Sequence, residues 1–399
     1  MSNQFLKNTD EIYIMLKNKI FLGLLIMALV LAACSSTSNT TSGTAKDTTT
    51  IPDTSSGLKP LQTGLVDMGS QVPYQQGQNF PIVNLSELGS DSSAFKGIVV
   101  NETWAQLEPT PNTYDWTDLD QSLAVVTAYN SAHPSNQLSV KLRIFSGKGA
   151  PTWAKQLGGP SITLLTTKQK VPGTFGRWWT PQYDQAWSAF QHAMSIRYDS
   201  NPLILATAVT SCSSSTGEPF VVSVNNSNIQ TLDKAGWSTQ AQENCIQNIF
   251  SDYSGWKKTS IDLAANPLPS LVNGKITSND TFTNQIIAKC ISSYSHGGPN
   301  CIIGNNDLSD IVTQNGAAPV YTEISNLWNE APGTFTAYFQ TVGPNKLLSC
   351  KSINIAITHH AKSVELWPPT NFIKGFAAIP LSTLLQWNSG LINGKQVRC

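Results

Sequence analysis

Residues 201–220 read NPLILATAVTSCSSSTGEPF, and this stretch decides the fold. The run 203–209 is almost entirely apolar, which is typical of a strand buried on both faces of a parallel sheet. The preceding segment, 180–198, has apolar residues at helical spacing. Small polar residues follow the strand, and then one carboxylate, Glu218, between Gly217 and Pro219. The pattern predicts an α/β fold that presents Glu218 at the C-terminal end of a strand; the alternative is a Glu on a surface loop.

Strands and helices alternate along the rest of the chain. We expect strands at residues 97–100, 138–145, 161–165, 203–210, 260–264, 301–304, 335–342 and 363–367. Helices are expected at 118–129, 182–198, 240–258, 282–293, 320–328, 346–361 and 379–387. This alternation predicts a parallel sheet closed into a single-domain (β/α)8, or TIM, barrel over residues 58–399. An open doubly wound sheet would need a glycine-rich turn after its first strand, and residues 101–104 (NETW) do not supply one.

The N-terminus has the pattern of a secretory signal. Lys17 and Lys19 precede an apolar run at 20–30, and small residues follow it. The run is short for a membrane span, so we expect a signal peptide over residues 1–33, with Met15 as a more ordinary start than Met1; an uncleaved anchor helix is the alternative. Residues 31–34 (LAAC) resemble the lipobox of bacterial lipoproteins, and this resemblance implies lipidation of Cys34.

Residues 34–57 are rich in Ser and Thr and almost free of large apolar side chains. Such a segment cannot bury enough surface to fold, so we expect a flexible linker. A lipid anchor at Cys34 would hold the folded part in the cell envelope, facing the periplasm or the exterior.

The cysteine count agrees with an oxidising compartment. Seven cysteines less Cys34 leave an even number, six, which allow fifteen pairings that sequence alone cannot separate. Proximity along the chain favours the pairs Cys212–Cys245, Cys290–Cys301 and Cys350–Cys399. We expect no metal site and no cofactor, because the chain has no CxxC motif and no histidines at ligand spacing.

Composition narrows the class of partner. The net charge is zero, charged residues are only 13% of the chain, and no run of Lys and Arg is present. A nucleic-acid partner is therefore not expected. Eleven Trp residues together with abundant Asn, Ser, Thr and Gln suit neutral, hydroxyl-rich ligands such as oligo- or polysaccharides, whose apolar faces stack on aromatic rings.

Two segments resemble a known group of enzymes. Residues 104–120 (WAQLEPTPNTYDWTDLD) resemble the segment after the first strand of retaining (β/α)8 glycoside hydrolases, such as the family 42 β-galactosidase-like and related endoglycanase groups. Residues 142–153 (LRIFSGKGAPTW) resemble their second strand and the loop that follows it, and residues 197–199 with Glu218 also fit. The similarity covers residues 97–220 and extends to the second half only through topology.

The resemblance implies a reaction and leaves its second carboxylate open. It gives Glu218 the role of general acid/base, whereas these enzymes carry the nucleophilic Glu at the end of strand seven. The expected seventh strand ends in Gln340-Thr341-Val342 and has no carboxylate there. Glu365, at the end of the eighth expected strand, is the nearest candidate, and Asp307 is a weaker one. Glu365 could equally be a residue of the barrel mouth that only binds sugar or loop backbone.

The remaining candidate residues would bind substrate. We expect the polar side chains of Asn101, Glu102, Arg143, Asp307 and Gln340 to contact sugar hydroxyls, and the rings of Trp104, Trp153, Trp178, Trp179 and Trp367 to stack on sugars. Trp187 and Trp387 lie on expected helices, where core packing is favoured. The leading hypothesis is a lipid-anchored glycoside hydrolase, and the alternative is a catalytically inactive barrel that serves as a carbohydrate-binding surface lipoprotein.

Overall fold

The computed structural model describes residues 57–71, 79–165, 172–213, 218–219, 226–272, 275–310, 318–342, 349–367 and 379–399. The expected signal peptide, Cys34 and the linker up to residue 56 lie outside this part of the chain. None of the helices within it is long and apolar enough to span a bilayer.

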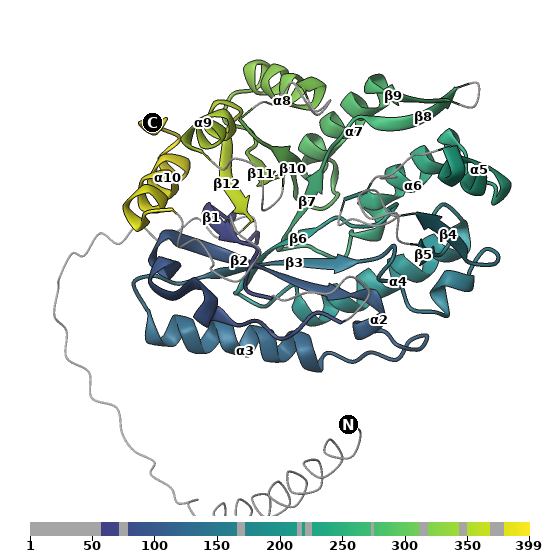
Figure 1. Ribbon diagram of the computed structural model, residues 1–399, viewed down its shortest axis with the longest axis horizontal. Helices are drawn as coiled ribbons and strands as arrows, with labels where there is room; N and C mark the ends of the chain where they lie inside the picture. The colour runs from purple at the N-terminus through teal and green to yellow at the C-terminus, as the bar shows by residue number, and fades with distance from the viewer. Residues whose placement is uncertain are drawn as a thin grey trace, which may run out of the picture. The chain divides into compact units, whose positions relative to one another are not determined.

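Eight parallel strands close into a barrel in the order β1-β12-β11-β10-β7-β6-β3-β2 (Figure 1). The strands are β1 (Gly64–Asp67), β2 (Phe95–Thr103), β3 (Ser139–Phe145), β6 (Ile204–Ala208), β7 (Ser260–Ala264), β10 (Cys301–Leu308), β11 (Ala337–Thr341) and β12 (Ala361–Leu366). The predicted (β/α)8 barrel is therefore confirmed.

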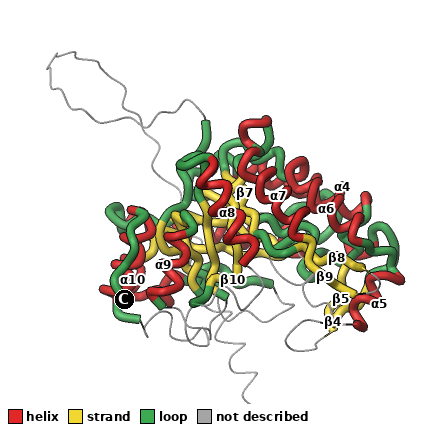
Figure 2. Tube along the Cα trace, turned by 90° about the horizontal axis from the view of Figure 1, so that it is seen from above, coloured by secondary structure: helices red, strands yellow, loops and turns green. Residues whose placement is uncertain are grey.

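Helices form the layer outside the strands (Figure 2). The α-helices are α2 (Trp104–Leu107), α3 (Thr117–Ala132), α4 (Pro181–Tyr198), α5 (Asn226–Lys234), α6 (Thr239–Asp252), α7 (Asp280–Ser292), α8 (Ala318–Glu330), α9 (Cys350–Thr358) and α10 (Leu381–Asn393). Short 3₁₀ helices are η1 (Leu85–Ala94), η2 (Ala154–Gln156) and η3 (Tyr294–His296). Local sequence determines where two of these helices begin. Pro181 occupies the first turn of α4, and the Asn279 side chain caps α7 by accepting from the Phe282 N–H.

Two details of the predicted barrel are corrected. The first barrel strand is β1, which the sequence analysis missed because only four residues, GLVD, form it. The predicted strand at 161–165 corresponds to β4 (Ile162–Leu165), which pairs antiparallel with β5 (Pro172–Phe175) outside the barrel. Its alternation of buried and exposed residues is that of a hairpin strand and not of a barrel strand covered on both faces. The two errors compensate, so β6, which precedes Glu218, is still the fourth barrel strand.

Successive side chains of each barrel strand point alternately into the core between the sheet and the helices and into the barrel lumen. On β3, Val140, Leu142 and Ile144 belong to the large core between the sheet and the helices. Lys141 and Arg143 point the other way, into the barrel lumen, because they contact strands that are not neighbours of β3. Apolar side chains fill part of the lumen in two small clusters, one of Val66, Met68 and Val99, the other of Ala264, Ile302 and Tyr338.

Three disulfides within the described residues link helices of the outer layer to other parts of the chain. They link Cys212 to Cys245, Cys290 to Cys301 and Cys350 to Cys399, with Cα–Cα distances of 5.8, 5.1 and 5.6 Å. The first ties the chain after β6 to α6, the second ties α7 to β10, and the third ties α9 to the C-terminal residue. The pairing that proximity favoured is confirmed.

The insertions of the barrel lie on one side of it. The β4–β5 hairpin follows β3, α5 follows β6, and a second hairpin, β8 (Leu268–Val272) with β9 (Lys275–Asn279), follows β7 (Figure 1). Segments that follow strands lie at the C-terminal face of a barrel. Two of these insertions, α5 and the β4–β5 hairpin, are joined by hydrogen bonds. The side chain of Asn228 on α5 accepts from the Leu165 N–H and donates to the Leu165 carbonyl, both at 2.8 Å.

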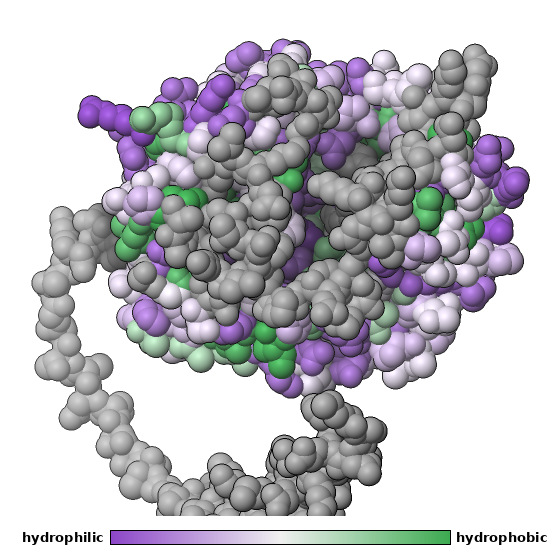
Figure 3. Space-filling model, in the orientation of Figure 1, coloured by the Kyte–Doolittle hydropathy of each residue, from purple (hydrophilic) through white to green (hydrophobic). Residues whose placement is uncertain are grey.

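The described surface in the view of Figure 3 is mostly hydrophilic or intermediate, with hydrophobic side chains in small separate groups. Six large apolar residues of the described part are exposed, and they come from several elements: Leu61, Ile82, Ile196, Tyr294, Leu385 and Ile392. Scattered exposed residues of this kind are ordinary on the surface of a folded domain.

Candidate active site

Glu365 lies inside the barrel, bound by two cations. It is 1% exposed, and its Oε1 and Oε2 accept hydrogen bonds from Lys141 Nζ and Arg143 Nη2, respectively. Both donors sit on β3, two residues apart, so the strand alternation aims them at the same point. Glu365 is on β12, and the contact therefore crosses the lumen.

A second carboxylate balances the charge. Lys141 Nζ also lies 2.7 Å from Asp262 Oδ2 on β7, and 3.7 Å from the centre of the Tyr338 ring. Two cations thus face two anions in a space from which solvent is nearly excluded. We call Lys141, Arg143, Asp262 and Glu365 the lumen ion cluster. Balanced pairing is what makes buried charge tolerable in a medium of low dielectric constant.

The two carboxyl groups of the cluster have different acidities. Burial alone would raise the pKa of Glu365, but the charges of Arg143 and Lys141 more than reverse this and hold its pKa below the ordinary value. Burial raises the pKa of Asp262, and Lys141 offsets this effect only in part. Glu365 is therefore ionised at neutral pH.

Glu218 lies near the same arginine. It follows β6, is half-buried, and its Oε1 accepts a hydrogen bond of 2.8 Å from Asn306 Nδ2 on β10. Burial lowers the pKa of Arg143, but the negative charges of Glu365 and Glu218 both raise it, and the net pKa lies above the ordinary value. The two candidate carboxylates thus act on one guanidinium group.

Gln340 and Trp367 also lie near Glu365. Gln340 is buried on β11 and is paired with Glu365 in the strand register. Trp367 directly follows β12, is partly exposed, and packs against the lumen cluster of Val66, Met68 and Val99. Its backbone N–H donates to Thr341 Oγ1 at 3.0 Å. An aromatic ring at this position can cover one face of a ligand at the barrel mouth.

Two other polar candidates are Asp307 and Asn101. Asp307, at the end of β10, is partly exposed, and its charge contributes to the raised pKa of the buried Tyr321 on α8. Asn101 is buried and held by Gln71, whose Oε1 accepts from the Asn101 N–H and whose Nε2 donates to the Asn101 carbonyl.

The expectation that Trp104 and Trp178 stack on sugars is corrected, because both rings are buried. Trp104 packs edge-on against Trp153, Tyr183 and Trp187, and its Nε1 donates to Glu108 Oε2 at 2.7 Å. Trp178 donates to Gln242 Oε1, and the half-buried Trp179 packs perpendicular to it. Trp153 is half-buried and donates to the Glu108 carbonyl. Trp187 and Trp387 are core residues, as predicted.

Glu102 is also a core residue and faces away from the lumen. It is 0% exposed, it pairs in register with the core residue Ile144, and neither carboxyl oxygen has a hydrogen-bond partner within the described part of the chain. Burial, reinforced by the charge of Asp118, raises its pKa to about 9. The expectation that Glu102 binds sugar hydroxyls is therefore corrected.

We expect Glu102→Gln to stabilise the protein above pH 5. The folded state holds a proton on Glu102 up to about pH 9, whereas the unfolded chain releases it near the ordinary pKa of 4.5, so stability falls as pH rises between these values. At pH 7 the proton that folding must place on Glu102 lowers the free energy of unfolding by on the order of 3 kcal/mol. A neutral amide of the same shape avoids this cost. Denaturant midpoints at pH 5, 7 and 8.5 measure the effect. The exposed Glu330 supplies the control Glu330→Gln, and equal pH profiles of the two variants would contradict the assignment.

The sequence analysis missed four residues of the site. They are Lys141, Asp262, Tyr338 and Asn306. Charged residues at every second position of an otherwise apolar strand, as in VKLRI at 140–144, are a signal for side chains that share a lumen. Asp262 within SIDLA carries the same signal. In the described part of the chain, no group of three or more His, Cys, Asp or Glu side chains could hold a metal ion.

No protein-family model matches the sequence, and no curated protein matches it. Among solved structures, endo-glycoceramidase II from Rhodococcus sp. is similar at 16% identity over 77% of this chain and 72% of that one, with a TM-score of 0.46. The catalytic domain of β-amylase from Paenibacillus polymyxa is similar at 11% identity over 82% and 100%, with a TM-score of 0.48. An endogalactoceramidase is similar at 12% identity over 78% and 71%, with a TM-score of 0.45. At this level the similarities assign neither a reaction nor a site residue to this chain.

Proposed function

We propose that this chain is a glycoside hydrolase that cleaves O-glycosidic bonds of an extracellular or periplasmic oligo- or polysaccharide. The observation that carries the proposal is the pair of carboxylates around Arg143: Glu365, ionised and bound by two cations, and Glu218, in the segment that follows the fourth strand. Active sites of (β/α)8 barrels lie at the C-terminal ends of the strands, where Glu218 follows β6.

The chemistry assigns a role to each carboxyl group. Glu218 would donate a proton to the leaving-group oxygen, held in position by its hydrogen bond from Asn306. Glu365 would act in its ionised form, either as the nucleophile of a retaining reaction or as the base that activates water in an inverting one. Trp367 and Gln340 would contact the sugar beside it. Retaining enzymes separate the two carboxyl groups by about 5–5.5 Å and inverting ones by about 6.5–9.5 Å.

One observation favours a second candidate, a catalytically inactive barrel that binds carbohydrate. Both oxygens of Glu365 are occupied by Lys141 and Arg143, and the side chain is almost inaccessible. The neighbouring strand, β11, carries Gln340 in place of a carboxylate. In this reading the lumen ion cluster is structural, and Glu218 and Trp367 only contact a bound sugar.

A parallel assay of cleavage and binding separates the two. The purified protein is incubated with aryl glycosides of both anomeric configurations and with neutral polysaccharides, and products and retention on the polysaccharides are measured. Release of sugar supports the hydrolase, and the anomer formed first reports the stereochemical course. Retention on a polysaccharide without cleavage of any substrate overturns the hydrolase in favour of the binding protein. Neither cleavage nor retention contradicts both.

We also propose that Cys34 is lipidated and anchors the protein to the cell envelope, because residues 31–34 resemble a lipobox. We expect Cys34→Ser to abolish labelling with a radioactive fatty acid and to move the protein from the membrane to the soluble fraction. Cys212→Ser, which breaks a disulfide of the folded part but leaves Cys34 in place, is the control and should keep the label. Unchanged labelling and fractionation of the Cys34 variant would refute the anchor.

A further inference from the structure

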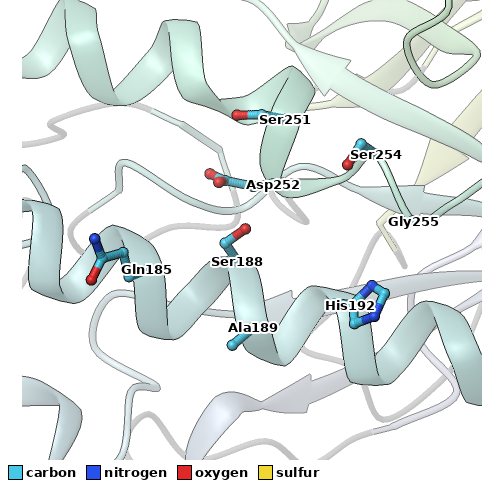
Figure 4. A pocket seen from close by; sticks show the side chains of 8 residues that line it. All are labelled: Gln185, Ser188, Ala189, His192, Ser251, Asp252, Ser254 and Gly255. Atoms are coloured by element: carbon cyan, nitrogen blue, oxygen red, sulfur yellow. The ribbon is translucent and has the colours of Figure 1, made fainter.

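A cleft lies on the outside of the barrel, between α4 and the C-terminal end of α6. Its volume is about 340 Å³. Gln185, Ser188, Ala189 and His192 line it from α4, and Ser251, Asp252, Ser254 and Gly255 from α6 and the turn after it (Figure 4). The candidate active site contributes none of these residues. The cleft falls in the size range of small-molecule sites, about 300–1,000 Å³.

Asp252 forms the buried floor of this cleft. It is 5% exposed, and its carboxyl group points into the space between the two helices (Figure 4). Its Oδ2 accepts no hydrogen bond within the described part of the chain. The other polar lining groups are hydroxyl, amide and imidazole side chains at or near the surface. A buried carboxylate oxygen without a partner costs free energy, which a ligand that donates to it recovers.

The electrostatics of the floor favour a cation. Asp184 of α4 lies near Asp252, and its Oδ2 accepts a hydrogen bond of 2.8 Å from Asn248 Nδ2. None of the lining residues is Lys or Arg, and His192 is the titratable side chain on the rim. Burial raises the pKa of Asp252 to about 8. The charge of Asp184 and a hydrogen bond between the two carboxyl groups add to this effect, whereas a hydrogen bond from Ser188 acts against it. Tyr253, next along the chain, is buried, and its raised pKa keeps it neutral.

We infer that the cleft between α4 and α6 is a binding site for a small organic cation with a primary ammonium group. The ammonium group binds Asp252 Oδ2 and replaces the proton that Asp252 otherwise retains. Two of the hydroxyl groups of Ser188, Ser251 and Ser254 accept its two remaining hydrogens. This site is independent of the proposed hydrolase activity.

Calorimetric titration with 1,4-diaminobutane tests the inference, with 1,4-butanediol as the uncharged control of the same length. The diamine should bind and the diol should not. The affinity for the diamine should rise about tenfold per pH unit from pH 6 to 8 and then level off, because Asp252 must lose its proton while alkyl amines stay charged. His192→Gln should keep this pH dependence.

Two variants locate the binding. Asp252→Asn should abolish it, and Ser254→Trp, which fills the exposed rim without touching the floor, should abolish it as well. Asp252→Asn changes a buried residue and could abolish binding by disturbing the fold. Ser254 is exposed, so loss of binding in Ser254→Trp would not have this cause. Diamine binding that survives both substitutions lies elsewhere and overturns the site. Equal affinity for the diol, or no diamine binding at millimolar concentration, also overturns it.

Discussion

Glu218→Gln should lower the rate of hydrolysis of ordinary glycosides by about 10²–10⁴-fold, the usual contribution of general acid–base catalysis. The amide keeps the shape of the side chain but has no acidic proton to donate to the leaving oxygen. Its hydrogen bond with Asn306 can persist, so binding of sugar should remain. Initial rates with substrates of poor and good leaving groups measure the effect.

The choice of leaving group separates catalysis from structural damage. An aryl glycoside with an acidic phenol needs little protonation, so its bond cleavage should be much less affected than that of an alkyl glycoside. Glu330→Gln, on the exposed end of α8, makes the same chemical change away from the barrel and should keep full activity. An equal loss for all substrates, together with a lowered melting temperature, would count against Glu218 as the acid. Full activity would place the site elsewhere.

The sequence predicts the barrel well because alternation of apolar strands and amphipathic helices is a local pattern. Residues 203–209 and the helix before them lie where the pattern places them, and Glu218 follows the fourth strand. β1 escapes the pattern, because four residues carry too little periodicity. The hairpin strand β4 imitates a barrel strand for the same reason, since alternation over a short run does not specify the partner.

The site is less predictable because it depends on which strands face each other across the lumen. Arg143 and Glu365 are separated by 222 positions in the chain, and only the closed barrel brings them together. The sequence is equally poor at predicting which side of the barrel wall a tryptophan faces. Trp104 and Trp367 both follow strands, yet Trp104 turns into the helix layer and Trp367 packs on the lumen cluster. A shift of one residue decides which side of the barrel wall a side chain faces.

Lys141→Met should destabilise the protein by about 3–5 kcal/mol at pH 7, the usual cost of breaking a buried ion pair from one side. Arg143 still neutralises Glu365 in this variant, but Asp262 loses the cation 2.7 Å from its Oδ2. Burial already raises the pKa of Asp262, so without Lys141 the folded variant should retain a proton there to higher pH. Its deficit should therefore shrink as the pH falls toward 5. Denaturant unfolding at both pH values measures the change.

Two further variants test whether the loss of stability in Lys141→Met is caused by unpaired charge in the lumen. Lys141→Met combined with Asp262→Asn removes both members of the pair and should recover part of the lost stability. Arg197→Met breaks the exposed pair with Asp120, where the side chains are 44% and 42% exposed, and should cost less than about 1 kcal/mol. If Lys141→Met costs no more than Arg197→Met, the lumen ion cluster is not held together as the geometry indicates. A double variant less stable than Lys141→Met alone would show that Asp262 stabilises the fold through contacts other than the one with Lys141.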